Sequence, residues 1–385
     1  MKDAIIIGGG PVGLHAARRL AAEGFDVEVL EEHACADEPV HCTGILSPEI
    51  FREFQLPPDV ILNELNTVEF HSPGGQVIHY RTERVEAVVV DRRAFDRNLR
   101  SLASASGAQV TLGAQVQHVE TGGTGVLVHC AGTEPREARA CILSAGATYA
   151  LHRDLGIGFP PVHLNCTQVE LPVGQKRDVE IYLGRDVAPK GFAWAVPVRR
   201  ADGIFARVGL MCEGDTTSYF ERFLPRLDNW KIPSGIEVQP RQRMLPLTPI
   251  RKTYGDRLLV AGDAAGFVKP VTGGGVYYGM ISAGIAAAVL AQALRRDRLN
   301  ESELSRYQQL WQERLMEEIE AQLTLRLLLQ RLTDGEVETI FDLWATDSLM
   351  PLVRKTATFN QYRKLIAAVV RNPGMRKILF NKMLS

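Results

Sequence analysis

Three glycines near the start of the chain have the spacing that a nucleotide pyrophosphate requires. Gly8-Gly9-Gly10-Pro11-Val12-Gly13 satisfies Gly-x-Gly-x-x-Gly, between an apolar run at residues 4–7 and a helical pattern. The first glycine permits a tight turn, the second lets the backbone approach the phosphates, and the third lets helix and strand pack closely. The helix start adds free N–H groups and a positive dipole end. We therefore predict a dinucleotide site whose cofactor contacts include Gly8, Gly10, Val12 and Gly13.

A carboxylate follows at a distance suited to a ribose. Residues 25–30 predict a second strand with Val27 and Val29 alternating, and Glu31 ends that strand 18 residues after Gly13. In a βαβ nucleotide site, an acidic residue about 20 residues on accepts hydrogen bonds from a ribose hydroxyl. A tight turn with a surface glutamate is the alternative. The combination of strand, glycines, helix and glutamate in one unit favours the cofactor site.

A second motif far along the chain distinguishes FAD from NAD. The apolar run Leu258-Leu259-Val260-Ala261 leads into Gly262-Asp263, so a predicted strand ends in a carboxylate. That position suits a hydrogen bond from a hydroxyl of the ribityl chain, which only the flavin nucleotide has. No second Gly-x-Gly-x-x-Gly follows a strand, so a nicotinamide cofactor would bind only transiently. These features predict FAD as the resident cofactor and NADPH or NADH as its reductant.

A glycine loop before a helix suits the flavin ring itself. Pro270-Val271-Thr272-Gly273-Gly274-Gly275 runs into a helical pattern that starts at Val276. Bare glycines at a helix start bring N–H groups and the positive dipole end against a flat ring, which favours the negative charge of a reduced flavin. A flexible loop with a glycine-rich cap is the alternative.

The elements around these motifs predict an α/β protein. It has a Rossmann-like FAD-binding domain interleaved with a β-sheet substrate domain, plus a C-terminal helical region. Alternating patterns at 164–171, 179–183, 192–198 and 204–211 predict strands of the substrate domain. The predicted boundaries are 1–45, 88–150 and 246–300 for the FAD-binding domain, 46–87 and 151–245 for the substrate domain, and 301–385 for the helical region.

Composition excludes several other classes of protein. Hydrophobic residues make up 45% and charged residues 23% of the 385, as in globular proteins, and the formal net charge is −1. The six cysteines form no Cys-x-x-Cys pair, so we expect no metal site, and we place the chain in the reducing cytoplasm. We expect no nucleic-acid partner. Residues 276–294 are uncharged and almost long enough to span a bilayer. Their small residues favour a buried helix instead.

Together these residues resemble the geranylgeranyl reductase family, in the wider group of flavoproteins that includes p-hydroxybenzoate hydroxylase. The resemblance covers about residues 1–300, and it includes Asp91-Arg92-Arg93-Ala94-Phe95-Asp96 besides the cofactor motifs. His41-Cys42-Thr43-Gly44 is similar to the family's cysteine–glycine loop near the flavin ring. Pro189-Lys190-Gly191-Phe192-Ala193-Trp194-Ala195-Val196-Pro197 is similar to its Pro-x-x-Tyr-x-Trp-x-Phe-Pro signature, with Phe192 in place of Tyr and Val196 in place of Phe.

The resemblance implies roles for further residues. Those expected to contact FAD are Cys42, Thr43, Gly44, Arg92, Val116 (through its backbone), Asp263, Gly275 and Val276. Phe192 and Trp194 face the same side of a predicted strand, and with Pro197 they are expected to line the substrate pocket. Core packing is the alternative for the two rings, and a small buried side chain is the alternative for Cys42.

The resemblance also implies an activity: an FAD-dependent reductase that saturates carbon–carbon double bonds of an apolar prenyl-type substrate. NADPH or NADH reduces the FAD, which passes a hydride to one alkene carbon while a proton reaches the other. The proton donor stays open between Cys42, Tyr277 and a bound water. The alternative is a flavin monooxygenase or halogenase acting on an aromatic or polyketide-like substrate. Residues 192–197 contain only the second tryptophan of the halogenase motif Trp-x-Trp-x-Ile-Pro.

Two further alternatives fit the sequence less well. A dehydrogenase that delivers electrons to quinone would carry a C-terminal cluster domain, and no cysteine follows Cys212. A non-catalytic prenyl-binding escort protein would lack a full flavin site, whereas both cofactor motifs are intact here.

The C-terminal tail is strongly basic. Beyond Asp347 no acidic residue occurs, and eight basic ones do: Arg354, Lys355, Arg363, Lys364, Arg371, Arg376, Lys377 and Lys382. Residues 362–371 also have apolar side chains at helical spacing. The tail 354–382 either docks on the protein body or rests on an anionic bilayer, where each basic residue is worth at most ~1 kcal/mol. The second choice would make the cytoplasmic chain a peripheral membrane protein.

Overall fold

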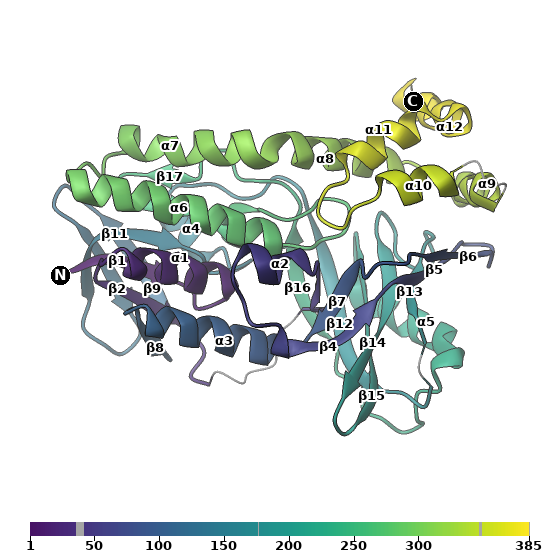
Figure 1. The fold of residues 1–385 in the computed structure, drawn as a ribbon, viewed down its shortest axis with the longest axis horizontal. Helices are drawn as coiled ribbons and strands as arrows, with labels where there is room; N and C mark the ends of the chain where they lie inside the picture. Colours follow the sequence, from purple (N-terminus) through teal and green to yellow (C-terminus); the bar gives the residue numbers. More distant parts are fainter. Residues whose placement is uncertain (36–41, 176, 346–348, 385) are drawn as a thin grey trace. The chain divides into compact units, whose positions relative to one another are not determined.

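The computed structural model describes residues 1–35, 42–175, 177–345 and 349–384, with side chains as far as residue 378. The chain divides into two units, each built from three segments. The first, here called the nucleotide unit, comprises Met1–Val40, Arg92–His163 and Leu245–Ile319. The second, here called the sheet unit, comprises His41–Asp91, Leu164–Met244 and Glu320–Ser385. Figure 1 labels the helices and strands of both.

The nucleotide unit is built on a mainly parallel sheet. Its strands lie in the order β17-β18-β11-β1-β2-β8, and the hairpin β9–β10 pairs with β11. The central strands are parallel, with Ile6 opposite both Val29 and Ile142. The strands are β1 (Lys2–Ile7), β2 (Val27–Glu31), β8 (Gln109–Leu112), β9 (Val116–Thr121), β10 (Val126–Cys130), β11 (Arg136–Leu143), β17 (Tyr254–Gly255) and β18 (Leu258–Val260). Because β1 is covered on both faces, it is apolar without alternation.

The helices of this unit follow the predicted order. Helix α1 begins at Pro11, where the missing N–H of proline costs nothing, and it buries Leu14, Ala17 and Leu20. The predicted helix at 92–106 is α3, and a short 3-10 turn, η3, follows β18. The helical elements are α1 (Pro11–Ala22), α3 (Arg92–Ala105), α4 (Ala150–Asp154), η3 (Gly262–Ala265), α6 (Val276–Arg296), α7 (Glu301–Trp311) and the π-helix η4 (Gln312–Met316).

Helix α6 is long and apolar enough to cross a bilayer by length and composition. However, 61% of its most apolar stretch is buried within the structure. Ser282, Ala286 and Leu290 are fully buried, and Gly279 lies against Val12 of α1. This is the burial of a core helix, as the sequence predicts.

The sheet unit has a seven-stranded sheet in the order β16-β12-β15-β14-β13-β5-β6, and a small sheet β3-β7-β4. Its strands are β3 (Ile45–Leu46), β4 (Ile61–Leu65), β5 (Thr67–His71), β6 (Val77–Arg81), β7 (Ala87–Val90), β12 (His163–Pro172), β13 (Val179–Tyr182), β14 (Phe192–Arg200), β15 (Gly203–Cys212) and β16 (Arg241–Pro246). The four predicted strands of this region are therefore present, within about two residues of their predicted ends.

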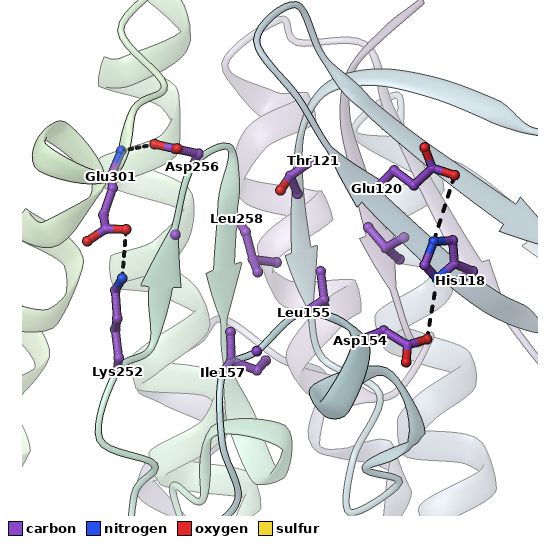
Figure 2. A pocket seen from close by; sticks show the side chains of 13 residues that line it. His118, Glu120, Thr121, Asp154, Leu155, Ile157, Lys252, Asp256, Leu258 and Glu301 are labelled. Carbon is purple, nitrogen blue, oxygen red and sulfur yellow. Dashed lines mark hydrogen bonds and ion pairs between the residues drawn. The ribbon is translucent and has the colours of Figure 1, made fainter.

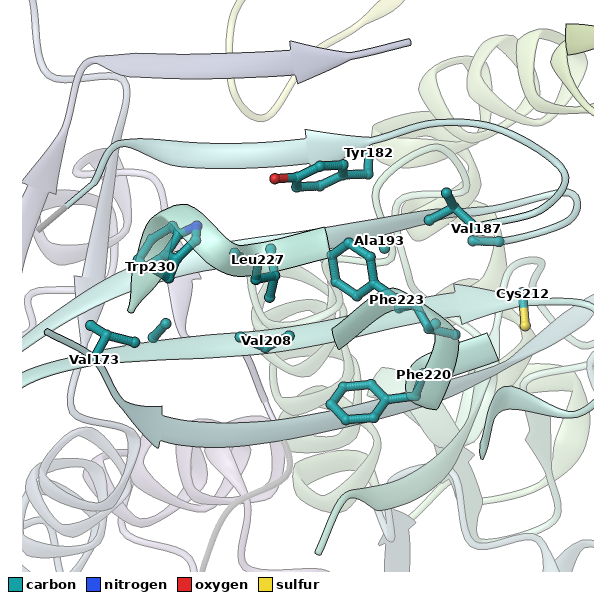
Figure 3. Close-up of a cluster of buried hydrophobic side chains, with 14 residues drawn as sticks. Val173, Tyr182, Val187, Ala193, Val208, Cys212, Phe220, Phe223, Leu227 and Trp230 are labelled. Carbon is teal, nitrogen blue, oxygen red and sulfur yellow. The ribbon is translucent and has the colours of Figure 1, made fainter. Parts of the chain in front are cut away.

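One face of the large sheet is covered by a helical segment. Helix α5 (Thr216–Phe223) and the 3-10 helix η2 (Leu224–Trp230) pack Phe220, Phe223 and Trp230 on β14 and β15. Figure 3 shows these rings over Ala193 and Val208. Since side chains alternate along a strand, Phe192 and Trp194 belong to the opposite face. Two short helical elements, α2 (Glu49–Glu53) and η1 (Pro58–Val60), complete the first part of this unit.

The C-terminal helices do not form a separate region. The division between units falls inside α8 (Glu317–Leu329), so the helical region predicted at 301–385 is split between them. In the sheet unit, Phe341 packs on Ile78, and Glu338 accepts hydrogen bonds from the Ser72 hydroxyl at 3.0 Å and the Gly74 N–H at 2.6 Å. These contacts hold the helices on the β5–β6 hairpin. The remaining helices are α9 (Asp334–Ala345), α10 (Met350–Thr356), α11 (Arg363–Arg371) and α12 (Pro373–Leu384).

The predicted domain boundaries also shift elsewhere. Residues 42–45 and 88–91 belong to the sheet unit because β3 and β7 pair with each other in the small sheet. Residues 151–163 belong to the nucleotide unit, where His152 bonds to the turn after β18.

Candidate functional site

The glycine turn of the nucleotide unit is closed on one side and open on the other. Gly8 has φ +105°, and its N–H donates to the Leu30 carbonyl at 2.8 Å. A Cβ on Gly8 would overlap the Ser144 carbonyl, and one on Gly13 would overlap the Gly8 carbonyl. A Cβ on Gly10, by contrast, would meet nothing within 4 Å. Gly8 and Gly13 are therefore required by the packing of the protein, whereas Gly10 leaves open space at the start of α1.

The start of α1 has the chemistry of an anion site. No side chain caps it, and no acidic residue occupies its first turn. Val12, predicted to contact the cofactor, directs its side chain toward Gly262 and Gly279, where an added Cβ would lie 2.9 and 2.7 Å from a Val12 methyl group. Contact between Val12 and a phosphate would therefore use the backbone N–H.

Glu31 is fixed at the end of β2, beside the glycine turn. One carboxylate oxygen accepts from the Gly9 N–H at 2.6 Å, and the other accepts from the His33 N–H at 3.1 Å and from the His33 ring. The Glu31 carbonyl accepts from the Ala114 N–H at 2.8 Å. This bond holds Ala114, two residues before Val116, at the end of β2. Glu31 and Val116, two predicted cofactor residues from distant parts of the chain, therefore lie near the same end of the sheet.

Asp263 is a carboxyl group with a raised pKa beside this turn. It lies in η3, and burial raises its pKa to about 6, although the nearby positive charge of Arg92 opposes the shift. Its carboxylate receives no hydrogen bond from the residues that the structure describes. Arg92 itself forms a two-pronged ion pair with Asp96, at 3.1 and 3.2 Å. A hydroxyl donor would satisfy the Asp263 carboxylate, which fits the ribityl chain of FAD.

Two side chains that the sequence did not suggest hold the Asp263 turn. The Tyr149 hydroxyl donates to the Asp263 carbonyl at 3.0 Å, and Nε2 of His152 bonds to the Ala264 carbonyl at 2.7 Å. Burial lowers the pKa of His152, and because the Ala264 carbonyl can only accept, Nε2 is the donor in this bond. No local motif marks these residues, because they follow β11 and reach the turn only in the folded chain.

The glycine loop 273–275 lies directly beside Asp263. Gly275 is the N-cap of α6, and a Cβ there would overlap an Asp263 carboxylate oxygen. Val276 begins the helix, and its first turn has no acidic residue. Tyr277 is half-buried, with its ring centroid 6.2 Å from that of Tyr278. The nucleotide unit therefore brings the two glycine motifs, Glu31 and Asp263 together at one end of its sheet, with space and donor groups that fit FAD.

In the sheet unit, two of the predicted pocket residues, Phe192 and Trp194, share the face opposite α5. The ring centroids of Phe192 and Trp194 are 5.8 Å apart. Trp194 is 7% exposed, and its indole N–H has no hydrogen-bond acceptor among the described residues. Gly209 lies opposite it on β15, and a Cβ there would come within 2.6 Å of the indole. The absence of a side chain at Gly209 therefore lets the indole lie flat on the sheet.

Pro197 does not share this face. It pairs with Ala206, a residue of the core under α5, so its ring points away from Phe192 and Trp194. Five positions separate it from Phe192, and an odd separation reverses the side on a regular strand. We therefore no longer assign Pro197 to the pocket face.

The segment that follows His41 is anchored on the same face; His41 itself lies outside the described residues. The Thr43 hydroxyl donates to the Gln168 side chain at 2.6 Å, and Cys42 accepts the Gly44 N–H at 3.3 Å. The buried Arg207 donates to the Thr43 carbonyl at 2.6 Å, and to the Val90 carbonyl at 3.1 Å. Sequence reasoning missed Arg207 because neither its type nor its neighbours mark it.

One carboxylate, bound by two arginines, completes this anchor. Glu170 accepts from Arg207 at 2.8 Å and from Arg200 at 2.7 Å. Burial raises the pKa of Glu170, but the two guanidinium groups outweigh it and leave the pKa below its usual value. The Cys42–Gly44 segment is thus held by a fully ionised network.

A cleft of about 540 Å³ in the nucleotide unit contains none of the predicted site residues. Figure 2 shows Leu155, Ile157 and Leu258 between two polar walls. On one wall His118 pairs with Asp154, and on the other Lys252 pairs with Glu301. With four carboxylates and one lysine in its lining, this cleft is unsuited to the phosphates of a nicotinamide cofactor.

One cluster in the sheet unit has the residue types of a metal site. Ligand atoms of Glu69, His71 and Glu180 lie within 4.8 Å of one another. Arg177, however, pairs with both carboxylates, and Glu180 also accepts from the Tyr182 hydroxyl at 2.6 Å and the Trp230 ring N–H at 2.8 Å. These carboxylates are already engaged by donors of the protein.

Comparisons with known proteins indicate the family of the chain. Residues 3–65 match the model of the FAD-dependent oxidoreductase family. Digeranylgeranylglycerophospholipid reductase 2 of Methanothermobacter thermautotrophicus is 30% identical over 353 residues, covering 88% of this chain and 90% of that protein. The crystal structure of a geranylgeranyl bacteriochlorophyll reductase-like protein from Thermoplasma acidophilum matches with a TM-score of 0.84 at 23% identity, over 99% of both chains. The halogenase PltM with FAD bound matches at 0.70 and 15% identity, over 100% of this chain and 91% of that one.

Proposed function

Because this chain belongs to the digeranylgeranylglycerophospholipid reductase family, we propose that it is an FAD-dependent enzyme that saturates carbon–carbon double bonds of a prenyl-chain lipid. NADPH or NADH is the reductant of the FAD. The relatives carry the name of a glycerophospholipid with two geranylgeranyl chains, and we propose a substrate of that class here. The halogenase matches are more distant and concern the fold alone.

One observation carries the proposal. The half-buried Asp263 carboxylate lies against Gly275 at the start of α6, and no described residue donates to it. A partly desolvated acceptor without donors is best satisfied when a ligand supplies them. Bound FAD would place its ribityl hydroxyls as donors at Asp263, and the N–H groups at the start of α1 would hold its pyrophosphate.

Bound FAD would supply two electrons, as a hydride, to one alkene carbon. The protein must supply the rest. An isolated trisubstituted alkene accepts hydride poorly, so protonation must lead or accompany the transfer. We retain Cys42, Tyr277 and a bound water as candidate proton donors. Cys42 and Tyr277 are both half-buried, and the Cys42 sulfur already accepts the Gly44 N–H.

The apolar chain of the substrate has a matching surface in the sheet unit. Phe192 is half-buried and Trp194 is buried, both on the face opposite α5, and the Cys42–Gly44 segment is anchored on that same face. We propose that this face binds the prenyl chain, and that the buried Trp194 N–H meets an oxygen of the lipid.

We further propose that the protein works in the cytoplasm at an anionic membrane surface, where its substrate resides. Helix α11 has no buried residue, and its exposed side chains include Lys364, Val370 and Arg371. Its apolar and basic side chains suit an interfacial helix. Inner residues of the tail still pack locally, since Val369 contacts the small core around Leu349 and Met375.

An anaerobic turnover assay tests the proposed reaction. Purified protein with FAD, NADPH and a detergent-dispersed geranylgeranyl lipid should yield products heavier by two hydrogens for each double bond, measured by mass spectrometry. Turnover that requires oxygen, with products that gain an oxygen or halogen atom, would instead establish the monooxygenase or halogenase activity.

A further inference from the structure

A buried lysine supports the glycine loop beside Asp263. Lys269 is 3% exposed and lies four residues after the Gly-Asp turn ends at Ala265. Its N–H donates to the Gly274 carbonyl at 3.1 Å, and its carbonyl accepts from the Gly273 N–H at 2.8 Å. The backbone of Lys269 thus closes the loop 273–275 into a fixed turn.

The side chain of Lys269 runs along the inside of that loop. A Cβ added to Gly274 would lie 2.9 Å from its Cε and 3.5 Å from its Nζ. At the next residue, a Cβ on Gly275 would overlap an oxygen of Asp263. The loop 273–275 is therefore contacted by the buried Lys269 amine at Gly274 and by the half-buried Asp263 carboxyl group at Gly275.

Burial of this amine costs desolvation free energy, which is offset only where its positive charge makes favourable interactions. Burial lowers the pKa of Lys269 to about 7, and the Glu318 carboxylate partly opposes the shift. A hydrophobic side chain would fill the same space without that cost. Charges in such a dry environment act over longer distances than at the surface, because water screens them less.

We propose that Lys269 is a positioning residue that supplies positive charge behind the loop 273–275 and thereby stabilises the anionic form of the reduced flavin. This inference rests on the proposed function, in which the flavin ring lies against that loop. The charge would act through the loop and add to the dipole of α6, whose first turn has no acidic residue. The flavin would therefore have a higher reduction potential than the helix dipole alone provides.

Sulfite is a direct probe of that charge. Its sulfur donates an electron pair to N5 of oxidised flavin, forming one S–N bond and leaving the negative charge on N1 and the C2 carbonyl. Lys269→Met and Lys269→Gln should bind sulfite about tenfold more weakly than the wild type. A tenfold change corresponds to about 30 mV for a two-electron couple, so the flavin midpoint potential should fall by that amount. Lys269→Arg, which keeps the charge, should retain both values.

A purely steric role predicts a different pattern. Lys269→Met would then lower the melting temperature but leave sulfite affinity and flavin potential unchanged, which overturns the inference. If both neutral variants lose FAD but Lys269→Arg keeps it, the result still shows that the positive charge is needed. If Lys269→Arg loses FAD as well, the inference about the charge is overturned.

The two proposals fail in different ways. If the wild type binds FAD but reduces no lipid, the proposed reaction is wrong, while the sulfite comparison still decides the role of Lys269. If the wild type reduces the lipid and all variants bind sulfite equally, only the role of Lys269 is wrong. A wild type that takes up no FAD would overturn both.

Discussion

The nucleotide unit and the sheet unit make their binding surfaces in different ways. In the nucleotide unit the surface is backbone: glycines at positions 8, 10, 13 and 275 whose neighbours are carbonyls, open space or the Asp263 carboxylate. In the sheet unit it is made of side chains, chiefly Phe192 and Trp194, that stand on strands. Backbone cannot move aside to admit a methyl group, whereas side chains can repack. Substitutions should therefore either abolish or spare the binding surface of the nucleotide unit, whereas they should weaken that of the sheet unit by degrees.

The largest effect is expected at Gly13. In Gly13→Ala the new methyl group overlaps the Gly8 carbonyl, so helix and strand must separate, at about 3 kcal/mol of unfolding free energy and with loss of FAD binding. Denaturant unfolding and FAD titration measure both.

Gly10→Ala is the matched control for that change. Its Cβ meets no protein atom within 4 Å, and the backbone φ of −77° suits alanine. The apo protein should keep its stability while FAD affinity falls, because the methyl group enters the pyrophosphate space. Equal losses of stability in both variants would contradict this distinction between Gly10 and Gly13.

Arg207 in the sheet unit should give the next largest effect. Arg207→Met leaves the Thr43 and Val90 carbonyls without their buried donor, and the unfolding free energy should fall by about 2 kcal/mol. Arg207→Lys should recover part of that loss. Because Thr43 is also expected to contact FAD, both FAD affinity and the KM for the prenyl lipid should worsen under conditions where the variant is fully folded. If both values stay unchanged, this anchor has no role at the site.

Asp263→Asn tests the unpartnered carboxyl group. FAD affinity should fall about tenfold, because hydrogen bonds to a charged acceptor are the stronger ones. In the apo wild type, the folded pKa of about 6 lies above the unfolded value of 3.8, so the folded state binds the proton more tightly. Apo stability should therefore fall as pH rises from about 4 to 6, and Asp263→Asn should remove that slope. Unfolding midpoints across this pH range measure it.

Gly209→Ala tests the face that carries Trp194, at some cost in stability. Its methyl group would meet the Trp194 indole at 2.6 Å and the Thr167 carbonyl at 2.7 Å, so the ring that we propose binds the prenyl chain must tilt and the strand must shift. We expect KM for the lipid to rise several-fold with FAD affinity unchanged. Gly123→Ala, which meets nothing within 4 Å, is the control. Unaltered KM would favour plain core packing for Trp194.

The smallest effect on folding and turnover is expected in the tail. Replacing both Lys364 and Arg371 by Gln should weaken binding to vesicles that contain anionic phospholipid by at most about thirtyfold, since each charge is worth at most ~1 kcal/mol there. Turnover of detergent-dispersed substrate should not change. Equal sedimentation with neutral phosphatidylcholine vesicles would rule out the electrostatic contribution.

How well the sequence predicts each unit follows from the same contrast. Residues 8–13 and 262–263 belong to local motifs, because tight turns and strand ends restrict residue types within a few positions. Tyr149, His152 and Lys269 act on the same turns but follow no such rule, since a hydroxyl, a ring nitrogen or an amine can reach a turn from many positions. They become visible only when β11, η3 and α6 are placed.

In the sheet unit the strands were predictable from alternation, and their pairing was not. Phe192 and Trp194 face one side because they are two residues apart, but Gly209 and Arg207 join them only through the β14–β15 and β12–β15 register. The assignment of Pro197 to the same face followed a family signature rather than the strand period, and the register reversed it. The C-terminal boundary was missed for a related reason: the continuous helical pattern hides a change of packing partner inside α8.

The central claim is that one flavin nucleotide is held by the glycine turn, Glu31 and Asp263. Titration of the purified apo protein with FAD, followed by flavin absorbance after removal of unbound cofactor, tests it directly. The account predicts a yellow protein with one FAD per chain. A folded protein that remains colourless in excess FAD would contradict it.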